Sequence, residues 1–116
     1  MSIDVIIKND QFQESFNCGS PVYKVIDDHM PSKGVVKGIL VIDGETTENV
    51  LMILRETLIN IETMRINLYD EKKSPDADMI QRYSCQGGSI LGGVTFISQI
   101  AIACAAIKNG KVHVSV

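Results

Sequence analysis

The amino-acid sequence predicts one small α+β domain, a two-layer sandwich with two to three helices on one face of a mixed or antiparallel sheet. Three observations support this. Three segments with strand-like composition precede the first helical pattern, helical segments follow, and an alternating segment closes the chain. The order β-β-β-α-α-α-β is typical of helices packed on one side of a sheet, and the length of 116 residues suits a single domain over residues 1–116.

Four segments predict the strands of this sheet. The first covers residues 3–7, where Ile3, Val5 and Ile7 alternate, and "KNDQ" follows as a turn. Residues 22–26 (VYKVI) and 35–42 (VVKGILVI) predict the second and third strands, and the apolar end of the third predicts a central position. Residues 111–116 (KVHVSV) predict the last strand, while "FQESFNCGSP" stays ambiguous.

The clearest helix begins at Thr46 or Thr47 and extends to about Tyr69, with apolar residues at three- and four-residue steps. Ser74-Pro75, followed by acidic residues, predicts a short second helix in a loop-rich region. A third helix is expected from near Ser89 to Asn109-Gly110. Because Asn-Gly is also a hairpin dipeptide, residues 94–107 have a strand as their alternative, but their alanine content favours a helix.

Composition and charge narrow the classes of partner. The net charge is −3, charged residues make up 22% of the chain, and no basic run occurs. This distribution argues against binding to nucleic acid or to an anionic membrane surface. A weakly acidic surface suits a basic protein partner, since complementary fields raise encounter rates.

The cysteines indicate the compartment. There are three, at Cys18, Cys85 and Cys104, without CxxC spacing, so we expect reduced thiols and a cytoplasmic location. The N-terminal segment lacks the basic region and the long apolar run of a signal peptide, so we expect none.

Residues 84–107 (SCQGGSILGGVTFISQIAIACAAI) contain no charge and are long enough to cross a membrane. Their first half is rich in glycine, serine and glutamine, which give little drive for insertion. The firmly apolar remainder suits a buried core helix behind a polar glycine-rich segment, so no membrane association is expected.

Two catalytic or ligand-binding interpretations start from the same stretch. Cys85 precedes Gly87 and Gly88, but a nucleophilic thiol needs a base, and both histidines are remote in sequence. Gly87 and Gly92 have the separation found in a phosphate-binding loop, but Gly93 and Val94 stand where that loop needs lysine and a hydroxyl residue. No nucleotide-binding motif is therefore complete. Binding of an anion at the N-terminus of the third helix remains an alternative.

Two acidic clusters remain. Asp27-Asp28-His29 suggests a metal site only weakly, because adjacent loop residues rarely converge on one ion, so a solvated loop is expected. A second cluster is a candidate surface for a basic protein and comprises Asp70, Glu71, Asp76 and Asp78.

These observations predict a small non-catalytic protein that acts by stoichiometric protein–protein interaction, in the manner of an inhibitor, a toxin-immunity protein or a phage counter-defence protein. No cofactor and no metal are expected. The sequence is compatible with a homo-oligomer. The alternative is an oligomeric binder of a small anion or nucleotide in the Arg82–Gly93 region, using Arg82, Tyr83, Ser84, Gly87, Gly88 and Ser89. The third hypothesis is an enzyme that depends on Cys85.

Overall fold

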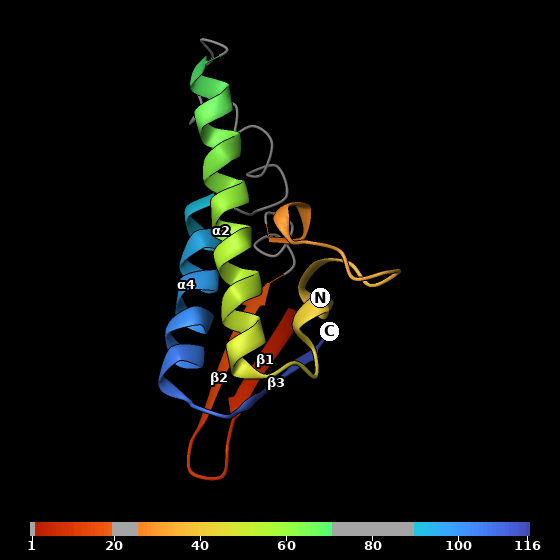
Figure 1. Ribbon diagram of the computed structural model, residues 1–116, viewed down its shortest axis with the longest axis vertical. Helices are drawn as coiled ribbons and strands as arrows, with labels where there is room; N and C mark the ends of the chain where they lie inside the picture. Colours follow the sequence, from red (N-terminus) through yellow and green to blue (C-terminus); the bar gives the residue numbers. More distant parts are fainter. Residues whose placement is uncertain (1, 20–25, 71–89) are drawn as a thin grey trace.

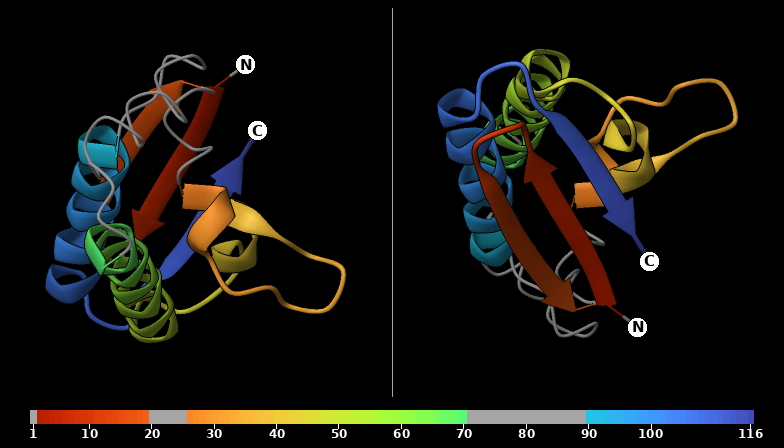
Figure 2. Two further views of the ribbon diagram at one scale, coloured as in Figure 1. Left: turned by 90° about the horizontal axis from the view of Figure 1, so that it is seen from above. Right: turned by 90° about the horizontal axis from the view of Figure 1, so that it is seen from below.

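The computed structural model describes residues 2–19, 26–70 and 90–116 and confirms a small α+β fold (Figure 1). Its named elements follow in chain order: strand β1 (Ser2–Lys8), strand β2 (Gln13–Gly19), 3-10 helix η1 (Gly38–Ile42), helix α2 (Thr47–Asp70), helix α4 (Ile90–Ala106) and strand β3 (Lys111–Ser115). Helices α2 and α4 lie side by side over the sheet (Figures 1 and 2).

The sheet has three strands in the order β2-β1-β3, and both pairings are antiparallel. On central strand β1, alternate side chains Ile3, Val5 and Ile7 are buried under the helices. The opposite face carries mostly polar residues, among them Asp4 and Lys8, which are exposed. One face is therefore apolar and covered, as expected for an antiparallel sheet in a two-layer domain.

Residues 9–12 form the turn expected from "KNDQ". The Asn9 side chain organises it, because its Oδ1 accepts hydrogen bonds from the N–H groups of Gln11 and Phe12, each at 2.8 Å. Residues 13–19 of the ambiguous stretch form β2, which pairs along its whole length with β1.

Helix α2 agrees with its prediction over nearly its whole length. Thr46 is its cap: the Thr46 Oγ1 accepts a hydrogen bond from the Asn49 N–H at 3.2 Å, and its carbonyl accepts the first helical bond from Val50. Val50, Leu54 and Ile61 on the inner face are fully buried. Leu54 and Ile61 belong to the predicted periodic series, and the inner face of α2 packs against α4 and β3.

Residues 94–106 are helical, as predicted, and the strand alternative is wrong. Phe96, Ile97, Ile100 and Cys104 on α4 are buried in the core. Beyond the helix, Asn109 has a positive φ of 55°, the left-handed conformation that ends helices. β3 then follows as predicted and pairs with β1.

The predicted third strand, residues 35–42, is wrong. Gly38 has a φ of +69°, which breaks extended backbone, and a Cβ there would collide with the Asp27 carboxylate. The apolar residues after it form η1 beside β3, where Ile39, Val41 and Ile42 are buried and Leu40 is exposed. A short helix thus buries the residues that a central strand was expected to bury.

The predicted second strand, residues 22–26, is wrong at its end, because Ile26 lies in a helical turn at residues 26–29. The rest of that segment and the helix expected after Ser74-Pro75 lie outside the described residues.

Candidate functional site

The two edges of the sheet differ in how their backbone groups are used. Along the edge of β3, Gly44 donates its N–H to the Val112 carbonyl at 2.8 Å, and Val112 donates to Glu45 at 3.0 Å. The Val114 N–H donates to Asp43 Oδ1 at 2.9 Å. Residues 43–45 therefore cover the β3 edge with hydrogen bonds.

The same bonds establish which groups of β2 point outward. Backbone groups in an antiparallel strand alternate between its two neighbours. The backbone N–H and C=O groups of Val112 and Val114 point away from β1. The strand register therefore directs the backbone groups of Ile3, Val5 and Ile7 toward β2. The backbone groups of their partners Cys18, Phe16 and Glu14 point back toward β1. The outward groups belong to Gln13, Ser15 and Asn17, which we call the β2 edge.

The β2 edge has no strand beside it among the described residues. The side chains of Gln13, Ser15 and Asn17 are exposed. A row of backbone N–H and C=O groups next to solvent is a template on which another extended segment can pair.

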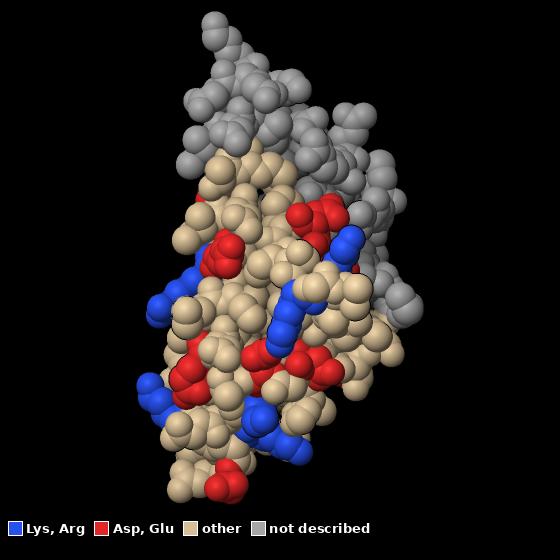
Figure 3. All heavy atoms as spheres, turned by 45° about the vertical axis from the view of Figure 1, so that its right-hand side comes forward, with Lys and Arg blue, Asp and Glu red and all other residues tan. Residues whose placement is uncertain are grey.

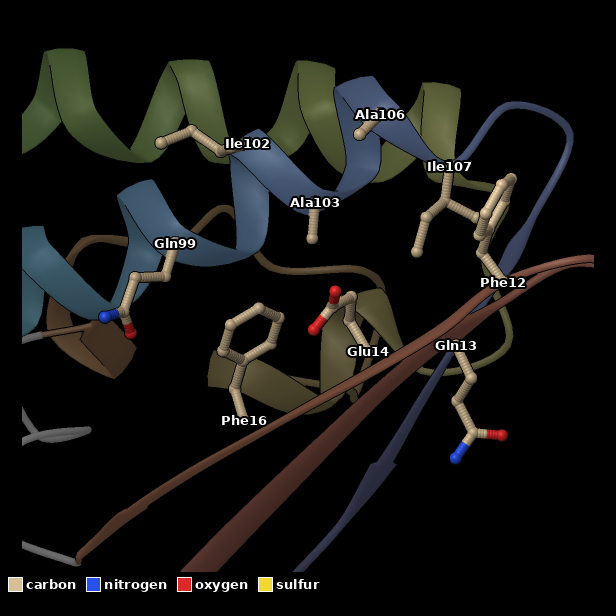
Figure 4. A pocket seen from close by; sticks show the side chains of 9 residues that line it. All are labelled: Phe12, Gln13, Glu14, Phe16, Gln99, Ile102, Ala103, Ala106 and Ile107. Atoms are coloured by element: carbon tan, nitrogen blue, oxygen red, sulfur yellow. The ribbon is translucent and has the colours of Figure 1, made fainter.

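A groove of about 460 Å³ lies between β2 and α4, directly beside this edge (Figure 4). Glu14 and Phe16 of β2 project toward α4, whereas Gln13 projects to the other side of the sheet (Figure 4). The lining is predominantly apolar and comprises Phe12, Gln13, Glu14, Phe16, Gln99, Ile102, Ala103, Ala106 and Ile107.

Two large apolar side chains of this groove are open to solvent. Phe12 is 60% exposed and Ile102 is 70% exposed. Phe12 precedes β2 and Ile102 lies on α4, so the groove has exposed apolar surface on both its sheet side and its helix side (Figure 4).

Of the described residues that line the groove, Glu14 alone carries a charge. Among the described residues, the Glu14 carboxylate has no ion-pair or hydrogen-bond partner. On the face seen in Figure 3, by comparison, acidic and basic side chains are interspersed. Elsewhere, Lys33 pairs with Glu45, and the Lys33 ammonium holds the pKa of Glu45 below its usual range.

The two described thiols lie in the core and not in the groove. Burial raises the pKa of Cys18 to about 11, with a further contribution from the negative charge of Asp27. Burial, followed by the negative charge of Glu48, also raises the pKa of Cys104 to about 11. Both side chains therefore stay protonated at neutral pH and are poor nucleophiles.

Most residues predicted to form a site fall outside the described part of the chain. These are the ligand-binding residues Arg82, Tyr83, Ser84, Gly87, Gly88 and Ser89, the thiol Cys85, and the acidic residues Glu71, Asp76 and Asp78. Asp70 is the last residue of α2.

Asp27-Asp28-His29 does not form the solvated loop that the sequence predicted. These residues lie in the helical turn 26–29, and Asp27 Oδ1 accepts the N–H of Ile39 at 2.9 Å. The His29 carbonyl accepts a hydrogen bond from Asn60 at 3.0 Å, and the His29 ring contacts the sulfur of Met64. The turn thus fixes η1 and α2 in place. Within residues 2–19, 26–70 and 90–116, no three potential metal ligands cluster.

Sequence analysis missed Phe12, Glu14 and Phe16. Their signal is an alternation in which Phe12, Glu14, Phe16 and Cys18 share one face. The acidic residue and the polar neighbours weaken the strand pattern, so the sequence of this stretch does not predict a groove.

Helices long and apolar enough to span a membrane are absent from the described residues. Comparison with models of protein families, with curated proteins and with solved structures finds no match for this chain.

Proposed function

We propose that this chain is a non-catalytic protein-binding module that takes an extended segment of its partner onto the β2 edge. The observation that carries the proposal is the asymmetry of the sheet. Residues 43–45 cover the edge of β3, whereas the outward groups of Gln13, Ser15 and Asn17 face solvent beside an apolar groove.

Strand addition uses both features. Main-chain hydrogen bonds supply affinity, and pockets that receive alternate side chains supply specificity. The groove lies on the side of the sheet toward which Glu14 and Phe16 project (Figure 4). An added strand would place every second side chain on that side.

The two other hypotheses, an anion or nucleotide site in the Arg82–Gly93 region and an enzyme based on Cys85, depend on residues outside the described part of the chain. An inhibitor, immunity or counter-defence role is a finer prediction within the protein-binding class.

The test compares two substitutions at Ser15. Ser15→Pro removes an outward N–H that the β1–β2 ladder does not use, and proline is tolerated on edge strands. Ser15→Ala keeps the N–H and removes only the exposed hydroxyl. We expect the Pro variant to lose about tenfold or more in partner affinity and the Ala variant to bind as the parent does.

The measurement is affinity capture from the native host with quantitative mass spectrometry, using the parent chain and both variants as baits. Circular dichroism confirms that both variants fold. Retention by Ser15→Pro of every protein that the parent enriches would exclude the β2 edge as the binding surface. Concentration-dependent dimerisation that Ser15→Pro abolishes would instead identify a second copy as the occupant.

A further inference from the structure

We propose that the segment bound at the β2 edge carries a lysine or arginine opposite Glu14, with an apolar residue two positions away on each side. The inference rests on the proposed function and specifies its partner. It follows from how charge and apolar surface alternate along β2.

Glu14 is the charged side chain on a predominantly apolar surface formed by described residues. Its cross-strand partner is Ile7, which is fully buried, and Phe12 and Phe16 flank it at two-residue spacing on the same side of the sheet. No described residue supplies it with a cation. A carboxylate in such surroundings favours a partner that brings a positive charge.

The opposite wall suits the stem of a long basic side chain. Ala103 and Ala106 of α4 line it and leave space above β2 (Figure 4). Lysine and arginine pack their methylene groups on apolar surface while the charged head reaches a polar group. The same side chain can therefore contact the alanines and pair with the Glu14 carboxylate.

The spacing along β2 determines the rest of the pattern. Side chains two positions apart on a strand are about 7 Å apart on one face. Apolar residues of the bound segment then lie opposite Phe12 and Phe16. The pattern apolar-x-Lys/Arg-x-apolar is the same in both chain directions, so it holds for parallel and antiparallel addition.

The same pattern argues against a second copy as the occupant. A twofold pairing of β2 with itself that matches Phe12 with Phe16 places Glu14 opposite Glu14. Like charges directly opposite each other destabilise a strand pair. Shifting that register by two residues in either direction places Glu14 opposite Phe12 or Phe16 and leaves its charge unpaired.

The test uses three labelled heptapeptides, Thr-Ile-Thr-Lys-Thr-Ile-Thr and its versions with Glu or Gln at the centre, measured by fluorescence anisotropy at low salt. The parent chain is expected to bind the Lys peptide about tenfold more tightly than the Glu peptide, a difference of about 1.4 kcal/mol. Glu14→Lys should reverse this order, and Glu14→Gln should nearly abolish the discrimination.

Glu56→Lys is the matched control. Glu56 is exposed on α2 and does not line the groove, so this substitution makes the same change in net charge elsewhere. The control should keep the parent's preference for the Lys peptide. Reversal by Glu56→Lys as well would assign the preference to net charge and overturn the proposal.

Other outcomes separate this inference from the proposed function. Equal binding of all three peptides, lost in Ser15→Pro, would overturn the basic preference and leave strand addition standing. Binding that Ser15→Pro does not weaken would overturn both. Failure of the parent chain to bind any of the three would overturn the proposed pattern, while capture of a partner that depends on the Ser15 N–H would still support the edge.

Discussion

Gly110 shows how closely single residues are packed where three elements meet. Its N–H donates to Thr47 Oγ1 at 3.3 Å, and its carbonyl accepts the Thr47 N–H at 3.0 Å. A Cβ at this position would lie 2.8 Å from the Lys8 carbonyl oxygen and 2.9 Å from the Ile107 Cγ2. The backbone approach between β1, α2 and the start of β3 therefore requires glycine.

We expect Gly110→Ala to lower the free energy of unfolding by about 1–3 kcal/mol, because a backbone oxygen cannot move aside as a flexible side chain can. Urea unfolding measures this. Ser115→Ala, an exposed position on β3, is the control and should change stability by less than about 0.5 kcal/mol. Equal stability of the two variants would contradict the tight packing around Gly110.

The thiols supply a second prediction at the residue scale. Since burial raises the pKa of Cys18 and Cys104 to about 11, both should resist iodoacetamide at pH 8 in the native protein and react after denaturation. Peptide mass spectrometry after timed alkylation measures each site. Rapid native labelling of either thiol would contradict its place in the core.

At the scale of elements, the start of α2 depends on one hydroxyl. Thr46 caps the helix, whereas Thr63 within the same helix donates its hydroxyl to the Ile59 carbonyl at 2.8 Å. The first bond satisfies an N–H that the helix leaves unpaired, and the second duplicates one that the helix already makes.

Alanine substitutions at these two positions should therefore differ. Thr46→Ala is expected to cost about 1 kcal/mol of stability. Thr63→Ala, an exposed position, should be neutral or stabilising by a few tenths of a kcal/mol because alanine has the higher helix propensity. Chemical denaturation of both variants gives the comparison, and a destabilisation of equal size would show that Thr46 is not the effective cap.

The elements that could be predicted from sequence share one property, a long local pattern. Apolar residues recur at three- and four-residue steps along most of the segment that forms α2, and the alanine content of α4 favours a helix over a strand. The prediction for residues 35–42 failed because composition suggested a strand while Gly38 adopts a left-handed conformation against Asp27. Asp27 is distant in sequence, so no local pattern contained that contact.

The groove was unpredictable for a related reason. The alternation of Phe12, Glu14 and Phe16 in the sequence is weak. Ala103 and Ala106 form a wall of the groove only because α4 lies beside β2 in the fold. The predicted function class, a protein-binding domain, followed from what the sequence lacked, whereas the proposed edge follows from what the structure brings together.

At the scale of the whole molecule, two glutamates connect the start of α2 to distant segments. Glu48 Oε1 accepts the N–H of Asn109 at 3.1 Å, which holds the pKa of Glu48 below its ordinary value of 4.5. The Lys33 ammonium lowers the pKa of Glu45 in the same way. Because both pKa values are lower in the folded chain, these groups stabilise it above about pH 4.5, and that contribution is lost as the pH falls through the folded-state values.

We therefore expect unfolding midpoints in urea to be level near neutral pH and to fall on acidification below about pH 4.5. Glu48→Gln should make this acid dependence shallower, since it removes one of the linked carboxylates. Glu56→Gln, at an exposed position on the same helix, should leave the dependence as in the parent. If the urea midpoint of Glu48→Gln falls on acidification as steeply as that of the parent, the role of the Asn109 contact would be contradicted.

The two buried thiols predict that the folded chain also loses stability at alkaline pH. Their raised pKa values favour the folded chain up to about pH 9, and that preference is lost between pH 9 and about 11, where the unfolded thiols ionise first. Stability should therefore decline at both extremes of pH.

The exposed β2 edge also bears on how this protein behaves when it is concentrated. Proteins usually guard such edges with lysine, proline or a bulge, and Gln13, Ser15 and Asn17 provide none of these at the outward positions. Glu14 is the one charge along the strand, and we expect that charge to oppose the pairing of identical chains edge to edge. Neutralising it should therefore lower the concentration at which the isolated protein aggregates, and a bound segment should raise that concentration by occupying the edge.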